Sequence, residues 1–136
     1  MDKVSAHQRS SNMAAVRSRD TAPELAVRKL LHSMGLRFRL HRSELPGTPD
    51  IVLPRHRAVV LVHGCFWHGH SCPRGRAPTS NTDFWLPKLD RNKARDAEQV
   101  NALRALGWRV LIVWECEVRD TRTLRRRLGR WFGLRA

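Results

Sequence analysis

The strongest constraint on the fold is an unbroken apolar run, Ala-Val-Val-Leu-Val, over residues 58–62. A strand with one wet face alternates apolar and polar residues, whereas a short run without alternation is typical of a strand buried on both faces. Such a strand needs a layer of structure on each side. The run therefore predicts the centre of a sheet that is covered by helices.

The residues around this run predict those helices. Thr21 fits an N-cap, Pro23 falls in the first turn, Glu24 completes a capping box, and apolar residues at helical spacing lead to a stop at Gly35. The expected elements in chain order are a helix from residue 21, strands over 36–40, 50–53 and 58–62, a helix over 90–106, a strand over 108–114 and a helix over 121–131. This order predicts an α/β fold with a mixed sheet flanked by helices.

The length of 136 residues favours one domain, over residues 21–136, preceded by a polar and basic arm over residues 1–20. Three of the five tryptophans fall on the last predicted strand and helix, and we expect all three in the core: Trp108, Trp114 and Trp131.

The charge points to a polyanionic partner. The formal net charge is +14, from 26 Lys and Arg against 12 Asp and Glu. An excess of this size costs self-repulsion, and it gives salt-dependent affinity for phosphates. Nucleic acid is the first candidate and an anionic membrane surface the second. No apolar run approaches the roughly 20 residues of a membrane span, and the first residues lack the apolar core of a signal peptide. We therefore expect a cytoplasmic protein.

A dense cluster of metal-ligating residues follows the apolar run. Residues 63–72 hold two cysteines, three histidines and an adjacent Phe-Trp pair, inside a stretch that lacks helix or strand periodicity up to about residue 88. A loop of this length is unusual in a compact domain unless something ties it down. A structural zinc held by three thiolates and one imidazole would do so; the candidate ligands are Cys65, His70, Cys72 and Cys116. The alternative is three unrelated thiols beside a surface histidine.

Two further residues suit phosphodiester hydrolysis. Asp50 opens a predicted strand, and its carboxylate is a hard oxygen ligand of the kind that Mg²⁺ prefers. His68 lies two residues before a candidate zinc ligand, and an imidazole has a pKa suited to a general base. By itself, a Pro-Asp pair at a turn is nearly always structural.

Four motifs give the chain a resemblance to a known family. They are LPGTPD over residues 45–50, HGCFWH over 63–68, DFWL over 83–86 and GWRVLIVWEC over 107–116. The chain resembles the very short patch repair (Vsr) endonucleases, bacterial enzymes that nick DNA beside a T:G mismatch left by deaminated 5-methylcytosine. The resemblance implies a restriction-endonuclease-like core of the PD-(D/E)xK type, a structural Zn²⁺, Mg²⁺-dependent hydrolysis and cleavage 5′ of the mispaired thymine.

The resemblance also implies roles for individual residues. Asp50 would bind Mg²⁺, with the backbone carbonyl of Val62 as a second contact, and His68 would be the general base. His63 would assist at the phosphate, and Glu24 and Asp96 would be supporting acids. The residues implied at the DNA are the wedge residues Phe66, Trp67 and Trp85, the inserting Met13 on the arm, and the base-reading Lys88 and Asn92.

Several of these residues have simpler explanations. The capping box alone accounts for Glu24, and Asp96 has basic neighbours with which it could pair. Trp85 could pack the loop down, Met13 could dock on the core, and Lys88 could contact a phosphate. Val62 and Gly64 stand where related nuclease cores carry a second acidic ligand and a lysine.

Two other functions stay open at this point. One is a non-catalytic, zinc-containing DNA-binding protein, and the other is a related Mg²⁺-dependent nuclease that acts on another DNA lesion or structure. The expected partners are mismatched double-stranded DNA and, through recruitment, mismatch-repair proteins. A monomer without membrane contact is expected.

Overall fold

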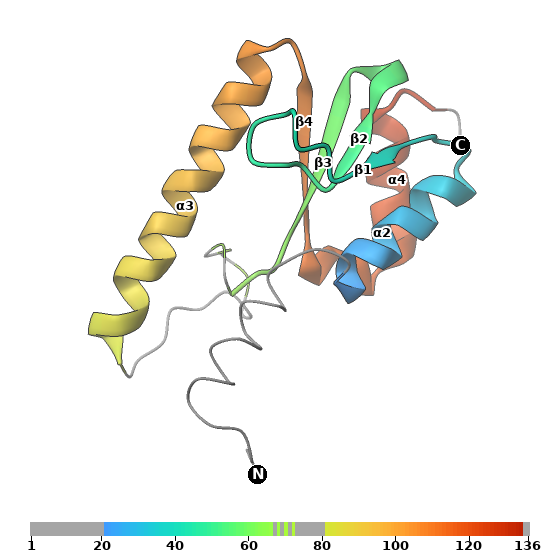
Figure 1. Cartoon of the computed structure of the whole chain (residues 1–136). Helices are drawn as coiled ribbons and strands as arrows, with labels where there is room; N and C mark the ends of the chain where they lie inside the picture. The colour runs from blue at the N-terminus through green and yellow to red at the C-terminus, as the bar shows by residue number, and fades with distance from the viewer. Residues whose placement is uncertain (1–20, 67, 69, 71, 73–80, 135–136) are drawn as a thin grey trace.

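The computed structural model describes residues 21–66, 68, 70, 72 and 81–134. Its centre is a four-stranded sheet in the order β1-β2-β3-β4 (Figure 1). The strands are β1 (Arg39–Leu40), β2 (Ile51–Leu53), β3 (Ala58–His63) and β4 (Arg109–Trp114). β1 and β2 are antiparallel, as are β2 and β3, while β3 and β4 are parallel. The predicted mixed sheet and the predicted order of elements are confirmed.

The apolar run lies at the centre of the sheet, as its composition predicts. β3 pairs with β2 on one side and with β4 on the other, and residues 58–61 are all buried. Alternate side chains of this strand serve two separate cores: Ala58 and Val60 face one, and Val59 and Leu61 face the other. A strand that supplies apolar side chains to both faces cannot alternate with polar residues.

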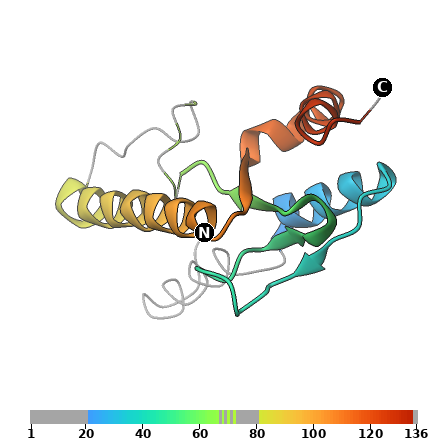
Figure 2. The same ribbon diagram turned by 90° about the horizontal axis from the view of Figure 1, so that it is seen from above.

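Helices cover both faces (Figures 1 and 2). α2 (Ala22–Ser33) and α4 (Thr121–Trp131) pack on one face, where Val27 and Leu31 meet Leu124 and Leu128 in the larger core. α3 (Thr82–Ala105) packs on the other, with Val100 and Leu103 in the smaller core. Within the described part of the chain, no helix has the length and apolar character that crossing a membrane requires.

The N-cap prediction for α2 is confirmed. The Thr21 hydroxyl accepts a hydrogen bond from the Glu24 amide at 3.3 Å, and Pro23 lies in the first turn. α4 has the predicted bounds, and the Asp120 carboxylate caps it by accepting from the Thr123 amide at 3.2 Å.

The predicted start of α3 at residue 90 is wrong by eight residues. The helix begins at Thr82 and runs through Pro87, so its first turns lie in the stretch that was expected to be irregular up to about residue 88. Pro87 is the sixth helical residue, so the amide that it lacks removes one hydrogen bond near the N-terminus and the helix tolerates it. The DFWL motif consequently lies on the first turns of a helix and not in a loop.

The strand predicted over residues 36–40 is also shorter than expected. Only Arg39 and Leu40 pair, with Val52 and Ile51 of β2. β2 supplies three residues before Pro54 begins the 3-10 turn η1 (Pro54–His56), so no longer ladder can form. Leu36 packs in the larger core just beyond the end of α2.

Candidate active site and metal-ligand cluster

One edge of the sheet gathers most of the predicted site residues. Because β3 and β4 are parallel, their carboxyl ends meet there, and His63 pairs with Trp114. β2 runs the opposite way, so its start lies at the same edge, and Asp50 immediately precedes it. The sheet topology thus brings together residues that are far apart in the sequence.

Asp50 lies beside Glu24 and two residues that the sequence did not single out, Arg28 and His41. The Glu24 carboxylate is 2% exposed and forms an ion pair with Arg28 one helical turn further along α2. His41 lies between the two acids, with Nε2 at 3.4 Å from Glu24 Oε1 and Nδ1 at 3.9 Å from Asp50 Oδ1.

The surroundings of Asp50 raise the pKa of its carboxyl group to about 6. Burial is the largest cause and the Glu24 charge adds to it, while His41, a backbone hydrogen bond from Val62 and Arg28 act in the opposite direction. A buried acid and a partly buried one that repel each other favour the binding of a cation, because a cation stabilises both charges. Glu24, His41 and Asp50 place one ligand atom each within 4.8 Å of one another.

His68 and Asp96 form a second pair. His68 Nδ1 lies 2.6 Å from Oδ2 of Asp96, a residue in the middle of α3. A carboxylate can only accept, so this hydrogen bond places the proton on Nδ1 and leaves the lone pair on Nε2. His68 is therefore set up to accept a proton. Asp96 pairs with this histidine and not with the basic neighbours on its own helix that the sequence offered.

His63 stacks on His68, with ring centroids 3.9 Å apart and planes 7° from parallel. Burial lowers the pKa of His63 to about 4, with the nearby His68 adding to the effect, so the ring is neutral near pH 7. Its Nδ1 is buried and, among the described residues, makes no hydrogen bond; Asp96 Oδ2 is 4.0 Å away.

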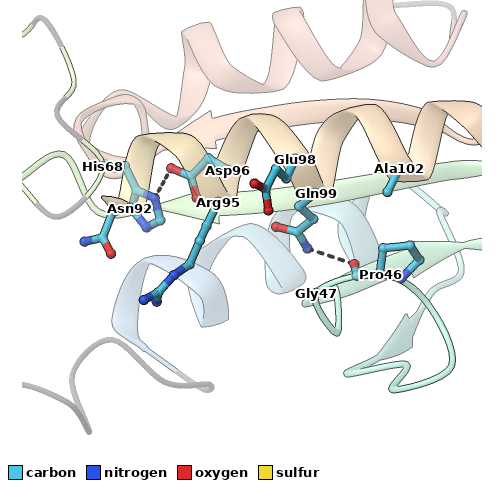
Figure 3. Close-up of a pocket in the computed structure, with 9 residues that line it drawn as sticks. All are labelled: Pro46, Gly47, His68, Asn92, Arg95, Asp96, Glu98, Gln99 and Ala102. Atoms are coloured by element: carbon cyan, nitrogen blue, oxygen red, sulfur yellow. Dashed lines mark hydrogen bonds and ion pairs between the residues drawn. The ribbon is translucent and has the colours of Figure 1, made fainter. Parts of the chain in front are cut away.

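A cavity of about 500 Å³ opens beside the His68–Asp96 pair, between the turn at Pro46–Gly47 and α3 (Figure 3). The Gln99 side-chain amide donates to the Pro46 carbonyl at 3.2 Å and anchors the turn to the helix. Gly47 has a φ of +71°, and a Cβ there would lie 2.6 Å from the Gln99 side chain. This close approach fixes the path of the chain just before Asp50. Asn92, which is 6% exposed, also lines the cavity.

The four predicted zinc ligands come together. Cys65, His70, Cys72 and Cys116 place their ligand atoms within 4.8 Å of one another. The cluster joins the start of the segment after β3 to η3 (Glu115–Arg119), the 3-10 turn directly after β4. Burial raises the pKa of Cys65 to about 12. Three thiols and one imidazole at this spacing fit a tetrahedral zinc, because the ion would stabilise the thiolates that burial otherwise disfavours.

Trp114 does not lie simply in the core, which corrects the expectation for that residue. Its ring stacks on His70 at 4.0 Å and 15°, and it meets His63 edge-on at 5.3 Å. Trp114 thus lies between the four candidate zinc ligands and the two stacked histidines, and it contacts both groups. The other two tryptophans, Trp108 and Trp131, are partly buried and pack against the smaller and the larger core.

An aromatic cluster lies at the start of α3. Phe66 meets Trp85 edge-on at 5.3 Å, and Phe84, 59% exposed, meets Trp85 at 4.9 Å. The Lys88 ammonium lies 5.5 Å from the Phe84 ring centre and 5.9 Å from that of Trp85. The predicted contacts Trp67 and Met13 lie outside the described residues.

Sequence reasoning missed Arg28 and His41 for different reasons. Arg28 is one of many basic residues, and on α2 only its position four residues after Glu24 singles it out. His41 belongs to no motif. Its left-handed backbone, with φ of +49°, is a feature that only the structure reveals.

Comparison with known proteins now identifies the family. Residues 1–74 match the family model described as DNA mismatch endonuclease Vsr. The chain is 47% identical to the DNA mismatch endonuclease Vsr of Escherichia coli, over 85% of this chain and 74% of that protein. The chain belongs to the Vsr DNA mismatch endonuclease family. Membership identifies it as a DNA endonuclease of very short patch repair and confirms the resemblance found in the sequence.

A second relative and a solved structure agree with this assignment. The type II nicking enzyme V.XorIIP of Xanthomonas oryzae is 56% identical, with 93% of each chain covered. The catalytic domain of the homing endonuclease I-Bth0305I superposes with a TM-score of 0.57 at 18% identity, over 83% of this chain and 95% of that one. The latter similarity shows a shared fold.

Proposed function

We propose that this chain nicks double-stranded DNA 5′ of the mispaired thymine at T:G mismatches, through Mg²⁺-dependent hydrolysis on a core of the restriction-endonuclease type. The observation that carries the proposal is the His68–Asp96 hydrogen bond at the sheet edge where Asp50 also lies. A proton acceptor and a carboxylate suited to a hard cation are what phosphodiester hydrolysis requires. The similarity to mismatch and nicking endonucleases supports the choice of substrate.

The residues around Asp50 fit a divalent cation, since a partly buried carboxylate with a second acid nearby favours positive charge. Asp50 would hold Mg²⁺, with the Val62 carbonyl as a second contact. When bound, the ion supplies positive charge that polarises the phosphoryl oxygen and stabilises the charge that develops during attack.

The proton transfer falls to His68. A water molecule attacks phosphorus, its proton passes to His68 Nε2, and the bond between phosphorus and the leaving oxygen breaks. Asp96 holds the ring in the tautomer that can accept this proton and stabilises the imidazolium that forms. The ring of His63 stacks on that of His68, and burial keeps it neutral. His63 would therefore assist at the phosphate without adding a competing positive charge. Glu24 supports the metal end of the site.

Recognition of the mismatch falls to the aromatic cluster and the arm. Phe66, Trp67 and Trp85 would enter the base stack beside the T:G pair, and Met13 would insert from the arm over residues 1–20. Unstacking costs a few kcal/mol per step, and a mismatched pair opens more readily than a matched one. Lys88 and Asn92 would contact the mismatched bases, and the single domain over residues 21–136 carries the chemistry. Cys65, His70, Cys72 and Cys116 would hold a structural Zn²⁺.

The test is a nicking assay on two duplexes that differ in one base. Purified protein with Mg²⁺ is incubated with a duplex that has one T:G mismatch in a methylation-site context, and with the matched T:A duplex. We expect a single nick 5′ of the mispaired thymine on the first duplex and none on the second. Equal cleavage of both duplexes, or cleavage only of abasic, T:T or branched substrates, would contradict the proposed specificity.

Trp85→Ala is expected to weaken discrimination more than chemistry. Base–aromatic stacking contributes about 1–3 kcal/mol per base, so affinity for T:G DNA should fall about tenfold or more while affinity for the T:A duplex changes little. Fluorescence anisotropy with both duplexes measures this ratio. The matched control is Trp108→Ala, because Trp108 directly precedes β4 and packs against the smaller core, away from the aromatic cluster. An equal loss of affinity for both duplexes in Trp85→Ala would contradict a wedge role.

A further inference from the structure

We propose that Glu24 and His41 complete the divalent-metal site of Asp50, and that Arg28 occupies this site as a stand-in cation until the metal ion displaces it. The inference rests on the proposed function, because it adds ligands to the metal ion held by Asp50. It assigns His41 as a nitrogen donor and Arg28 as a competitor of the metal.

The first support is the convergence of three ligand groups from three segments. Glu24 comes from the first turn of α2, His41 from the residue after β1, and Asp50 from the residue before β2. Their ligand atoms lie within 4.8 Å of one another, and their side chains are 2%, 13% and 28% exposed. Two carboxylate oxygens and one imidazole nitrogen form a donor set for a divalent ion that accepts both oxygen and nitrogen.

The backbone of His41 is fixed next to that of Asp50. The His41 amide donates to the Asp50 carbonyl at 3.1 Å, which closes the β1–β2 pairing at its end. The residue itself has a φ of +49°. This arrangement ties the two ligand-bearing segments directly to each other, so His41 and Asp50 keep a fixed spacing in the absence of metal.

The second support is the position of Arg28. Its guanidinium contacts the Glu24 carboxylate, and the same Nη2 atom lies 3.0 Å from His41 Nε2. Glu24 Oε1 and His41 Nε2 are 3.4 Å apart, and the positive guanidinium of Arg28 contacts both of them. The Arg28 side chain is only 14% exposed. A guanidinium held between two groups that could ligate a metal marks the place where the fold favours positive charge.

Charge and hydrogen bonding explain why Arg28 and a metal ion compete. An N–H donor at 3.0 Å requires the lone pair of His41 Nε2, and the metal ion would require a lone pair on the same ring. Two positive charges a few ångströms apart also repel strongly inside a partly buried site. Metal binding therefore requires the guanidinium to leave Glu24 and His41. If Arg28 served only to order Glu24 through their ion pair, its removal would have the opposite effect, because loosening a ligand would weaken metal binding.

The test measures Mn²⁺ binding to the full-length, zinc-loaded protein in the absence of DNA, by the electron paramagnetic resonance signal of free Mn²⁺. Arg28→Gln removes the competing charge and should tighten binding about tenfold. His41→Gln removes a ligand and should weaken it about 10- to 100-fold. Arg28→Lys keeps the cation and should stay near the wild-type affinity. The Mn²⁺-loaded wild type should show ¹⁴N coupling in its electron spin echo, and His41→Gln should lose it.

The matched controls lie on the exposed side of the same helix. Lys29→Gln removes the same charge as Arg28→Gln, and His32→Gln makes the same exchange as His41→Gln; both positions are exposed. Both controls should bind Mn²⁺ as the wild type does. The proposal is overturned if Arg28→Gln binds Mn²⁺ no more tightly than Lys29→Gln, or if ¹⁴N coupling persists in His41→Gln. Because Asp50→Asn is measured beside them, either result is distinguishable from failure of the proposed function, in which Asp50→Asn binds Mn²⁺ as tightly as the wild type.

Discussion

Asp50→Asn is expected to abolish nicking while the protein still binds mismatched DNA. The amide has the shape of the carboxylate but lacks its charge, so the proposed Mg²⁺ ion would lose its main anionic ligand. Metal stabilisation of the developing charge contributes several kcal/mol, and each 1.36 kcal/mol is a factor of ten in rate. We therefore expect the single-turnover nicking rate to fall about a thousandfold or more. Removing a negative charge from the edge proposed to face DNA should leave the affinity for DNA unchanged or slightly higher.

The control for this experiment is Asp90→Asn. Asp90 is exposed on α3, and the substitution makes the same charge change at a distance from the ligand group around Asp50. Its nicking rate should match that of the wild type. Residual nicking by Asp50→Asn within tenfold of the wild-type rate would contradict the role of Asp50 as the metal ligand. Loss of DNA binding together with nicking would point to a role in recognition.

Removal of zinc should have the largest effect on stability. Cys116 follows β4, whereas Cys65, His70 and Cys72 follow β3, so the ion would join two segments that the sequence separates by 44 residues or more. Cys116→Ser is expected to lose the stoichiometric zinc and to lower the free energy of unfolding by more than about 4 kcal/mol. For a chain of this size, that loss lowers the melting temperature by roughly 10 °C or more.

Zinc content is measured by native mass spectrometry and stability by thermal and urea unfolding. Arg119→Ser alters an exposed residue of the same 3-10 turn and should keep both zinc and stability. A wild-type protein that carries no zinc after expression in zinc-supplemented medium would contradict the prediction. So would a Cys116→Ser variant that keeps one zinc per chain. Nicking should fall with zinc loss, since Trp114 links the cluster to His63.

The local elements followed from the sequence wherever one short-range rule acted alone. The unbroken run over residues 58–62 predicted a central strand because burial on both faces leaves no position for a polar side chain. Thr21 predicted the start of α2, since an N-cap depends on neighbouring residues only. The prediction placed the start of α3 at residue 90 because the stretch before it lacks helical periodicity, whereas the helix begins at Thr82 and is held by the packing of Leu89, Val100 and Leu103.

For the candidate site, too, the sequence predicted the residues and not the contacts between them. Composition and motif singled out Asp50, His68 and the four candidate cysteine and histidine ligands, because thiols, imidazoles and a carboxylate near strand ends are chemically distinctive. Composition alone could not show that Asp96 pairs with His68 across 28 residues, nor that Trp114 lies between two clusters. Such contacts depend on how α3 crosses from β3 to β4.

Arg28 and His41 show most clearly what could not be predicted from the sequence. The sequence by itself determined the central strand, the order of the elements and the family, because hydrophobic periodicity, capping and motifs depend on a few neighbouring residues. Only the tertiary structure decided which charges share a site: the antiparallel pairing of β1 with β2 brings His41 to Asp50, and the packing of α2 on the sheet brings Glu24 and Arg28 to both. Electrostatic interactions depend on separation in space, and folding sets that separation between residues that are distant along the chain.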